Sequence, residues 1–163
     1  MTLHTYLPQD RLRALSRGET LPDRTSGSAL FADISGFTPL AESLRNSLGT
    51  RRGGEELNKY LNLVYGMLIA ELERYGGSVI GFAGDAMMCW FDASRGVGDQ
   101  GAGGSAVSCA FGMQTAIKEF PELGLKVAIA SGDARRFVVG DPEIQKLDAL
   151  VVGPAKPISA PAD

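Results

Sequence analysis

The sequence predicts an α+β fold of the ferredoxin-like type, in which a mainly antiparallel sheet carries helices on one face. Two observations lead to this prediction. Apolar residues recur at helical spacing in the middle of the chain, and short apolar runs bounded by glycines lie on both sides of them. The expected order is a strand, two helices, a hairpin, a helix, two further strands and a last strand. Two βαβ-like halves of this kind fit one sandwich.

The first strand is expected over residues 28–34, the stretch SALFADI. Thr38 is predicted to cap the following helix, with Pro39 at the first helical position, where its missing N–H costs nothing. That helix is expected to run to about Leu48 and to be broken by GTRRGG.

The next helix is the clearest prediction, because apolar residues recur every three or four positions and Gly76 and Gly77 follow it. The stripe consists of Leu57, Leu61, Val64, Leu68 and Leu72. SVIGFAGDAMMCWF then predicts a hairpin around the turn AGDA. The remaining expected elements are a mobile loop over ASRGVGDQGAGGS, a helix over about 106–120, a strand LKVAIASG, a short strand RRFVVG and a last strand in LDALVV.

Length and composition indicate one globular domain, expected over residues 27–163 after a leader and linker over residues 1–26. The net charge of −3 and the lack of a basic run argue against nucleic-acid binding, and no apolar stretch is long enough to span a membrane. Cys89 and Cys109 fall in apolar patterns, which indicates reduced core thiols in a cytoplasmic protein. The only histidine, His4, leaves no Ser-His-Asp triad and no histidine-rich zinc site.

Two aspartates have unusual positions. Asp33 ends an apolar strand, and Asp85 lies in the hairpin turn. In a ferredoxin-like sheet these positions can be neighbours, and two adjacent carboxylates repel unless a cation lies between them. Magnesium fits, because it prefers carboxylates together with substrate phosphates. Each aspartate alone is more often only a cap or turn residue, so the prediction depends on the combination.

The turn after Asp33 favours a phosphate. Ser35, Gly36, Phe37 and Thr38 lead into a helix whose first N–H groups and dipole attract anions. Gly36 would let the backbone approach the phosphate closely.

Three stretches carry a resemblance to a known family: FADISGFTPLAESL, YGGSVIGFAGDAMMCWF and LKVAIASGDARRFVVGDPE. They resemble the catalytic domain of class III nucleotidyl cyclases, nearest to the subgroup that contains soluble adenylyl cyclase and bacterial relatives. The resemblance covers about residues 30–153. It implies a dimer, formed with a second cyclase-like domain or with another copy, and a nucleoside triphosphate at the interface, ATP rather than GTP. It would make the chain an adenylate cyclase.

The resemblance also implies functional residues. Two Mg²⁺ or Mn²⁺ ions would be held by Asp33, Asp85 and the carbonyl of Ile34. The triphosphate would contact the turn from Ser35 to Thr38, and Gly84 would also lie in the nucleotide site. Lys126 would contact phosphate, although such a lysine alone is usually a solvated strand-edge residue.

The sequence departs from the family at three places. Gly81 stands where the family has an adenine-contacting lysine. Pro157 and Pro161 fall near positions of a catalytic asparagine and arginine, in a region where prolines oppose a helix. The chain also stops before the family's closing helix and hairpin, so a fragment of a longer polypeptide is expected. The alternative functions are a catalytically silent regulatory module and, less favoured by the retained Asp33 and Asp85, a pure dimerisation domain.

Overall fold

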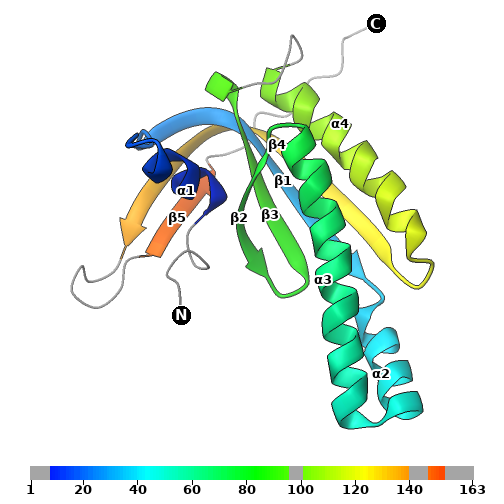
Figure 1. Cartoon of the computed structure of the whole chain (residues 1–163). Coiled ribbons are helices and arrows are strands. Elements are labelled where there is room, and N and C mark those ends of the chain that lie inside the picture. Colours follow the sequence, from blue (N-terminus) through cyan, green and yellow to red (C-terminus); the bar gives the residue numbers. More distant parts are fainter. Residues whose placement is uncertain (1–7, 96–100, 140–146, 153–163) are drawn as a thin grey trace, which may run out of the picture.

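The computed structural model describes residues 8–95, 101–139 and 147–152. The helices are α1 (Gln9–Ser16), α2 (Phe37–Leu48), α3 (Thr50–Arg74) and α4 (Gly101–Ala116), with 3-10 turns at Ala93–Arg95 and Ile117–Glu119. The strands are β1 (Arg24–Ser35), β2 (Ser78–Ala83), β3 (Ala86–Asp92), β4 (Gly124–Val139) and β5 (Leu147–Val152). Figure 1 labels these elements.

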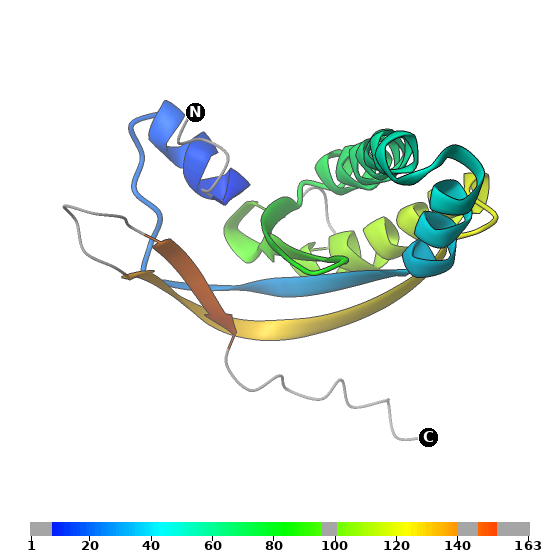
Figure 2. The ribbon, with the colours of Figure 1, turned by 90° about the horizontal axis from the view of Figure 1, so that it is seen from below.

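The five strands form one sheet in the order β2-β3-β1-β4-β5, and every neighbouring pair is antiparallel. Figure 2 shows α2, α3 and α4 together on one side of β1 and β4. The predicted α+β fold class is therefore confirmed, including the central position of the first strand. Within the described residues, no helix has both the length and the apolar character needed to cross a membrane.

The core lies between the sheet and the helices α3 and α4. Leu30, Ala32 and Ile34 of β1 alternate toward this layer and are almost completely buried. The helices contribute the buried side chains of Val64, Leu68, Leu72, Ala106, Cys109 and Met113. Burying an aliphatic side chain of the larger kind stabilises a fold by about 1.5–3 kcal/mol, so this layer fixes the orientation of β1.

The start of α2 differs from the prediction. The helix begins at Phe37, and Gly36 precedes it with a φ of 100°, so Thr38 is not the cap and Pro39 is not the first helical residue. The break that follows is also shorter than expected, because Gly49 alone separates α2 from α3 and the rest of GTRRGG is helical. With a φ of 79° at Gly49, one residue is enough to reverse the chain.

Two elements in the second half of the chain have other bounds than predicted, and α4 ends at Ala116 instead of about Phe120. α4 begins at Gly101, so the end of the expected loop is helical, whereas residues 96–100 lie outside the described residues. A Cβ at Gly103 would lie 3.6 Å from the hydroxyl oxygen of Ser131, an ordinary contact, so this part of the helix lies against the sheet but packing does not require the glycine. The two predicted strands LKVAIASG and RRFVVG form one strand, β4, because Gly132 pairs with Gly27 without interrupting the ladder.

The N-terminal helix α1 packs against the hairpin β2–β3. Figures 1 and 2 both show α1 and α3 on opposite sides of this hairpin. The Gln9 side-chain oxygen accepts a hydrogen bond from the Val79 N–H (3.1 Å), and Asp10 forms a buried 2.6 Å ion pair with Arg136 of β4. The helix therefore connects the edge strand β2 to β4.

Both cysteines are free and buried, as predicted. Burial raises the pKa of both thiols, that of Cys109 to about 12. The nearby Cys109 raises the pKa of Cys89 further, and the Glu71 carboxylate raises that of Cys109 further.

We expect both thiols to react with Ellman's reagent at pH 8 at least on the order of a thousandfold more slowly in the folded chain than in guanidinium, because the thiolate is the reactive form. The unfolded chain loses these protons first as the pH rises past 9, so the free energy of unfolding should fall there. Fast labelling of the folded chain would contradict the buried positions.

Candidate active site

Asp33 lies near the end of β1, on the face of the sheet away from α3 and α4. Its neighbours Ala32 and Ile34 are buried toward the helices, so the alternation of the strand turns Asp33 to the opposite face, where it is half-buried. In the ladder Asp33 lies between Ala86 of β3 and Lys126 of β4. A carboxylate thus occupies this face between the hairpin and a lysine.

Asp85 occupies the tip of the hairpin, directly before Ala86. Gly84 and Asp85 alone connect β2 to β3, and Gly84 has a φ of 65°, which explains the glycine at this position. Because Ala86 is the direct partner of Asp33, the pairing brings the two predicted aspartates to the same end of the sheet on adjacent strands. Within the described residues, neither carboxylate has a hydrogen-bond or ion-pair partner.

Tyr65 of α3 is a residue of this site that the sequence analysis missed. Its hydroxyl donates a hydrogen bond to the backbone carbonyl of Asp85 (3.1 Å). Its ring stacks on Phe37 (6.4 Å between centroids) and meets Phe82 edge-on (5.3 Å). Tyr65 thus ties the hairpin tip to the start of α2. The sequence signal is weak, because a tyrosine beside the leucine stripe of a helix is usually only a packing residue.

The pKa of Tyr65 reports the charge at this site. Burial raises this pKa, and the carboxylates of Asp85 and Asp33 raise it further. Both aspartates therefore act on the same phenol, as expected for two negative charges at one end of the sheet.

The turn after Asp33 is shaped by Gly36. Gly36 has a positive φ, which favours glycine. In addition, a Cβ at this position would collide with the Glu122 backbone carbonyl, so packing by itself already requires a glycine here. The following helix α2 has no side-chain cap and no acidic residue in its first turn. The first N–H groups of α2, at Phe37 and Thr38, are therefore not capped by a side chain.

The other predicted residues surround this end of β1. Lys126 is exposed and directly opposite Asp33, although no ion pair joins them among the described side chains. Ser35 is exposed opposite Gly124. Ile34 is buried, so only its backbone could contribute to a ligand site.

Gly81, the position of the missing lysine, lies in β2 opposite Met88. A Cβ at Gly81 would lie 3.5 Å from the Met88 terminal methyl group, an ordinary contact. The fold therefore has room for a side chain here, and the glycine is not required by packing.

The donor set fits magnesium bound together with a phosphate ligand. Among the described residues, no group of three or more histidine, cysteine, aspartate or glutamate side chains could enclose a metal ion. Two carboxylates without a cation partner supply hard oxygen ligands, and magnesium in enzymes usually completes such a pair with substrate phosphates and water.

No protein-family model matches the chain. It is 28% identical over 135 residues to adenylate cyclase type 10 of Oryctolagus cuniculus, covering 76% of this chain and 8% of that protein. It is 33% identical over 73 residues to adenylate cyclase type 10 of Homo sapiens, covering 45% of this chain and 4% of that protein. The chain thus spans less than a tenth of these curated relatives.

Solved structures with the same fold include a bacterial light-regulated adenylyl cyclase, with a TM-score of 0.71 and 20% identity, covering 91% of this chain and 44% of that one. The adenylyl cyclase CyaB from P. aeruginosa has a TM-score of 0.64 and 23% identity, and the match covers 78% of this chain and 66% of that one. The crystal structure of the guanylyl cyclase Cya2 has a TM-score of 0.62 and 26% identity, and the match covers 79% of this chain and 64% of that one.

The relatives in fold and sequence are class III adenylyl and guanylyl cyclase domains, bacterial ones among them, and the resemblance read from the motifs is confirmed. The chain has the fold of a nucleotidyl cyclase domain. In sequence it is similar to adenylate cyclase type 10 of mammals.

Tyr65 offers a test of charge at the site. Binding of a divalent cation near Asp33 and Asp85 should cancel their repulsion of the phenolate and lower the pKa of Tyr65 toward 10. The measurement is a titration of tyrosinate absorbance with and without Ca²⁺. The change should be absent in Tyr65→Phe and present in Tyr75→Phe, and an unchanged titration of the unsubstituted chain would contradict binding beside Tyr65.

Proposed function

We propose that this chain supplies the metal-holding half of an adenylate cyclase site, which forms cyclic nucleotide and pyrophosphate from a nucleoside triphosphate, ATP rather than GTP. The observation that supports the proposal is the pairing of Asp33 with Ala86, which brings Asp33 and Asp85 to the same end of the sheet on adjacent strands. Among the described residues, neither carboxylate has a hydrogen-bond or ion-pair partner. The similarity to adenylate cyclase type 10 supports ATP.

The residues of the chain would bind and orient the substrate. Asp33, Asp85 and the Ile34 carbonyl would hold two Mg²⁺ or Mn²⁺ ions. When bound, these ions would lower the pKa of the ribose 3′-hydroxyl and neutralise the departing pyrophosphate.

The uncapped start of α2 would bind the triphosphate through the N–H groups of Phe37 and Thr38, and the dipole of the helix would favour the negative charge. Ser35, Gly36 and Gly84 would lie beside the phosphates. Lys126, on the same face as Asp33, would pair with a phosphate oxygen.

A partner domain would cover the open face of the sheet. Phe31 and Met88 are cross-strand partners on this face and remain 41% and 38% exposed, beside Asp33. Large exposed apolar side chains grouped on one face are typical of an interface. Enclosure by a partner would also lower the local dielectric constant and strengthen the contacts to metal and phosphate.

The second candidate is a catalytically silent regulatory domain. Gly81 favours it, because the fold has room for the missing lysine and the chain nevertheless has no side chain there. Such a domain would still bind metal and nucleotide, so activity and binding have to be measured separately.

Calorimetry with Mn²⁺ and a non-hydrolysable ATP analogue tests the site. We expect metal-dependent binding that Asp33→Ala or Asp85→Asn abolishes. The matched control is Asp23→Asn, an exposed aspartate at the other end of β1, which should bind as the unsubstituted chain does. If the Asp33 and Asp85 variants bound the metal and the analogue as tightly as the unsubstituted chain, both candidate functions would be ruled out at this site.

A further inference from the structure

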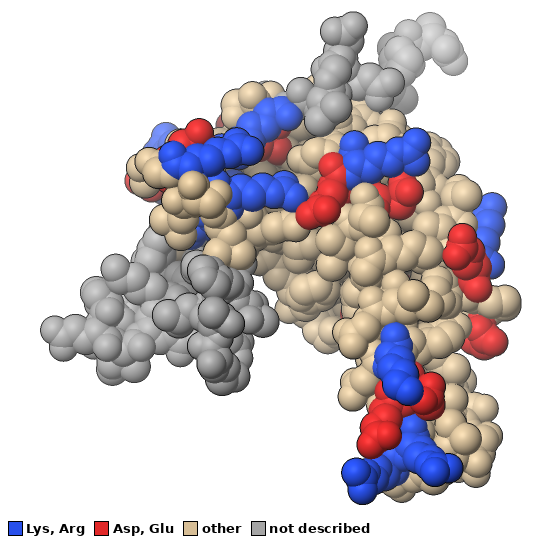
Figure 3. All heavy atoms as spheres, in the orientation of Figure 1, with Lys and Arg blue, Asp and Glu red and all other residues tan. Residues whose placement is uncertain are grey.

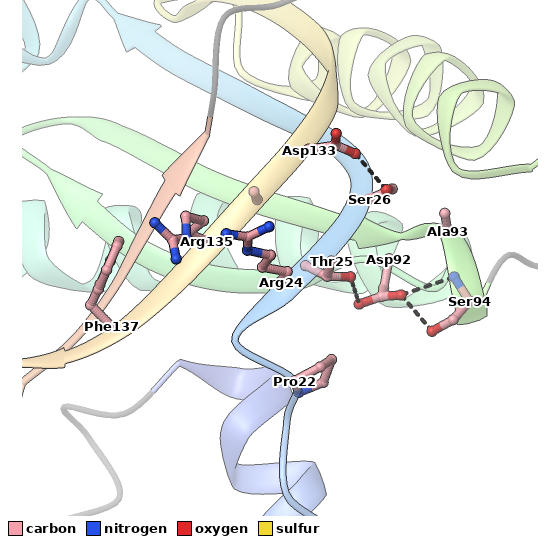
Figure 4. A pocket seen from close by; sticks show the side chains of 11 residues that line it. Pro22, Arg24, Thr25, Ser26, Asp92, Ala93, Ser94, Asp133, Arg135 and Phe137 are labelled. Atoms are coloured by element: carbon pink, nitrogen blue, oxygen red, sulfur yellow. Dashed lines mark hydrogen bonds between the residues drawn. The ribbon is translucent and has the colours of Figure 1, made fainter.

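A cavity of about 790 Å³ lies at the other end of β1 (Figure 4). Its walls come from the beginning of β1, the end of β3 and the second half of β4. Arg24 in this wall lies nine positions before Asp33, ~30 Å along an extended strand. Alternation also puts these two side chains on opposite faces of the sheet. The cavity is therefore separate from the site proposed above.

Two arginines lie side by side in this cavity. Arg24 of β1 and Arg135 of β4 are direct cross-strand partners, and Figure 4 shows their guanidinium groups next to each other. Like charges in this arrangement destabilise a sheet. Neither arginine has a hydrogen-bond or ion-pair partner among the described residues. The fold thus concentrates two positive charges in one wall of the cavity, and neither is ion-paired with a described residue.

The two acidic residues of the cavity accept hydrogen bonds from neighbouring serine and threonine residues and not from the arginines. Asp92 accepts hydrogen bonds from the Thr25 hydroxyl (2.8 Å) and from the Ser94 N–H and hydroxyl (2.9 and 2.6 Å). Burial acts to raise the pKa of Asp92, but these hydrogen bonds lower it, so the group stays ionised. Asp133 accepts a hydrogen bond from the Ser26 hydroxyl (2.6 Å). Hydroxyl groups therefore hold both carboxylates, and the arginines remain available.

The rest of the wall is partly apolar. Phe137 is 41% exposed, and the Arg135 guanidinium carbon lies 5.7 Å from the centre of its ring. Such a cation–π contact holds the guanidinium in place at little cost. Pro22, Ala93 and Ala134 complete the apolar part.

We propose that this cavity binds a small organic anion, with a carboxylate or phosphate group between Arg24 and Arg135 and an apolar body against Phe137 and Pro22. Paired guanidinium groups recognise such oxyanions by several charge-assisted hydrogen bonds. The cavity volume is in the usual range of small-molecule sites. In Figure 3, basic side chains gather at the end of the molecule near α1, which would attract anions.

Phenyl phosphate, benzoate and inorganic phosphate serve as probes, with EDTA present so that the metal site cannot contribute. Binding is followed by fluorescence of Trp90, the only tryptophan, which is buried two residues before Asp92, and is checked by calorimetry. We expect phenyl phosphate to bind more tightly than inorganic phosphate. Arg24→Gln and Arg135→Gln should each weaken phenyl phosphate binding about tenfold or more.

Two further variants complete the test. Arg52→Gln removes an exposed arginine of α3 and should leave binding unchanged. Phe137→Ala should remove the advantage of phenyl phosphate over inorganic phosphate. Stronger binding of benzoate than of phenyl phosphate would assign the site to carboxylates, and the reverse would assign it to phosphate esters. Binding of no probe at millimolar concentration, or equal binding by both arginine variants and the unsubstituted chain, would overturn the proposal.

Discussion

The 163-residue chain alone is expected to form cyclic nucleotide at a rate at least ~100-fold below that of the same chain combined with a complementary cyclase-type domain. Gly81 has no side chain to contact a purine, and Pro157 and Pro161 stand near the positions of the asparagine and arginine that the resemblance assigns to catalysis. Each missing transition-state donor commonly costs ~10²- to 10³-fold in rate. A homodimer would lack these groups at both sites.

The measurement is cyclase turnover of the chain, of a second domain that carries the lysine, asparagine and arginine, and of their mixture. Asp33→Asn in the mixture is the control, because it should abolish turnover if this chain supplies the metal ligands. High turnover by the chain alone would contradict the composite site. Metal-dependent nucleotide binding without turnover in the mixture would favour the regulatory domain.

The second large effect is expected at the buried ion pair between Asp10 and Arg136. Both side chains are less than 10% exposed, and their charged atoms are 2.6 Å apart. Replacing either residue with alanine leaves the other charge buried without its counter-ion, which typically costs about 3–5 kcal/mol. The free energy of unfolding, measured with urea, should fall by that amount in each variant.

A second ion pair of α1, which joins Arg13 to Glu73 of α3, provides the control. Arg13 and Glu73 are joined at 3.1 Å, but both are well exposed, so Arg13→Ala should change the free energy of unfolding by about 1 kcal/mol or less. Replacing Asp10 and Arg136 together with leucine and methionine should recover most of the lost stability. Equal small effects at both pairs would mean that α1 is not held by this contact.

The sequence predicts the sheet, and the position of Asp33 and Asp85 at one end of it, because both depend on local patterns. Apolar alternation around Leu30 identifies the central strand, and the turn at Gly84 identifies the hairpin. Once these two elements are neighbours in an antiparallel sheet, Asp33 and Asp85 must approach each other. No knowledge of side-chain packing is needed for that step.

The missed features depend on contacts between distant parts of the chain. Tyr65 reaches the Asp85 carbonyl only because α3 crosses the hairpin tip, and Asp10 meets Arg136 only after α1 docks. The predicted start of α4 is wrong because glycines usually signal a loop, whereas here Gly101, Gly103 and Gly104 lie in the first turn of the helix. Gly36 caps α2 because the Glu122 carbonyl leaves no room for a side chain.

The hairpin β2–β3 is clamped from two sides, by α1 near its base and by α3 at its tip. A shortened chain that starts at residue 27, where the sequence places the domain boundary, would lose the Gln9 oxygen that accepts the Val79 N–H. It would also lose the ion pair that links α1 to β4. The edge of β2 would then be free to pair with another chain, as exposed strand edges do in aggregation. The helix α1 thus covers the free edge of β2, and a chain made for experiments should include residues 8–26.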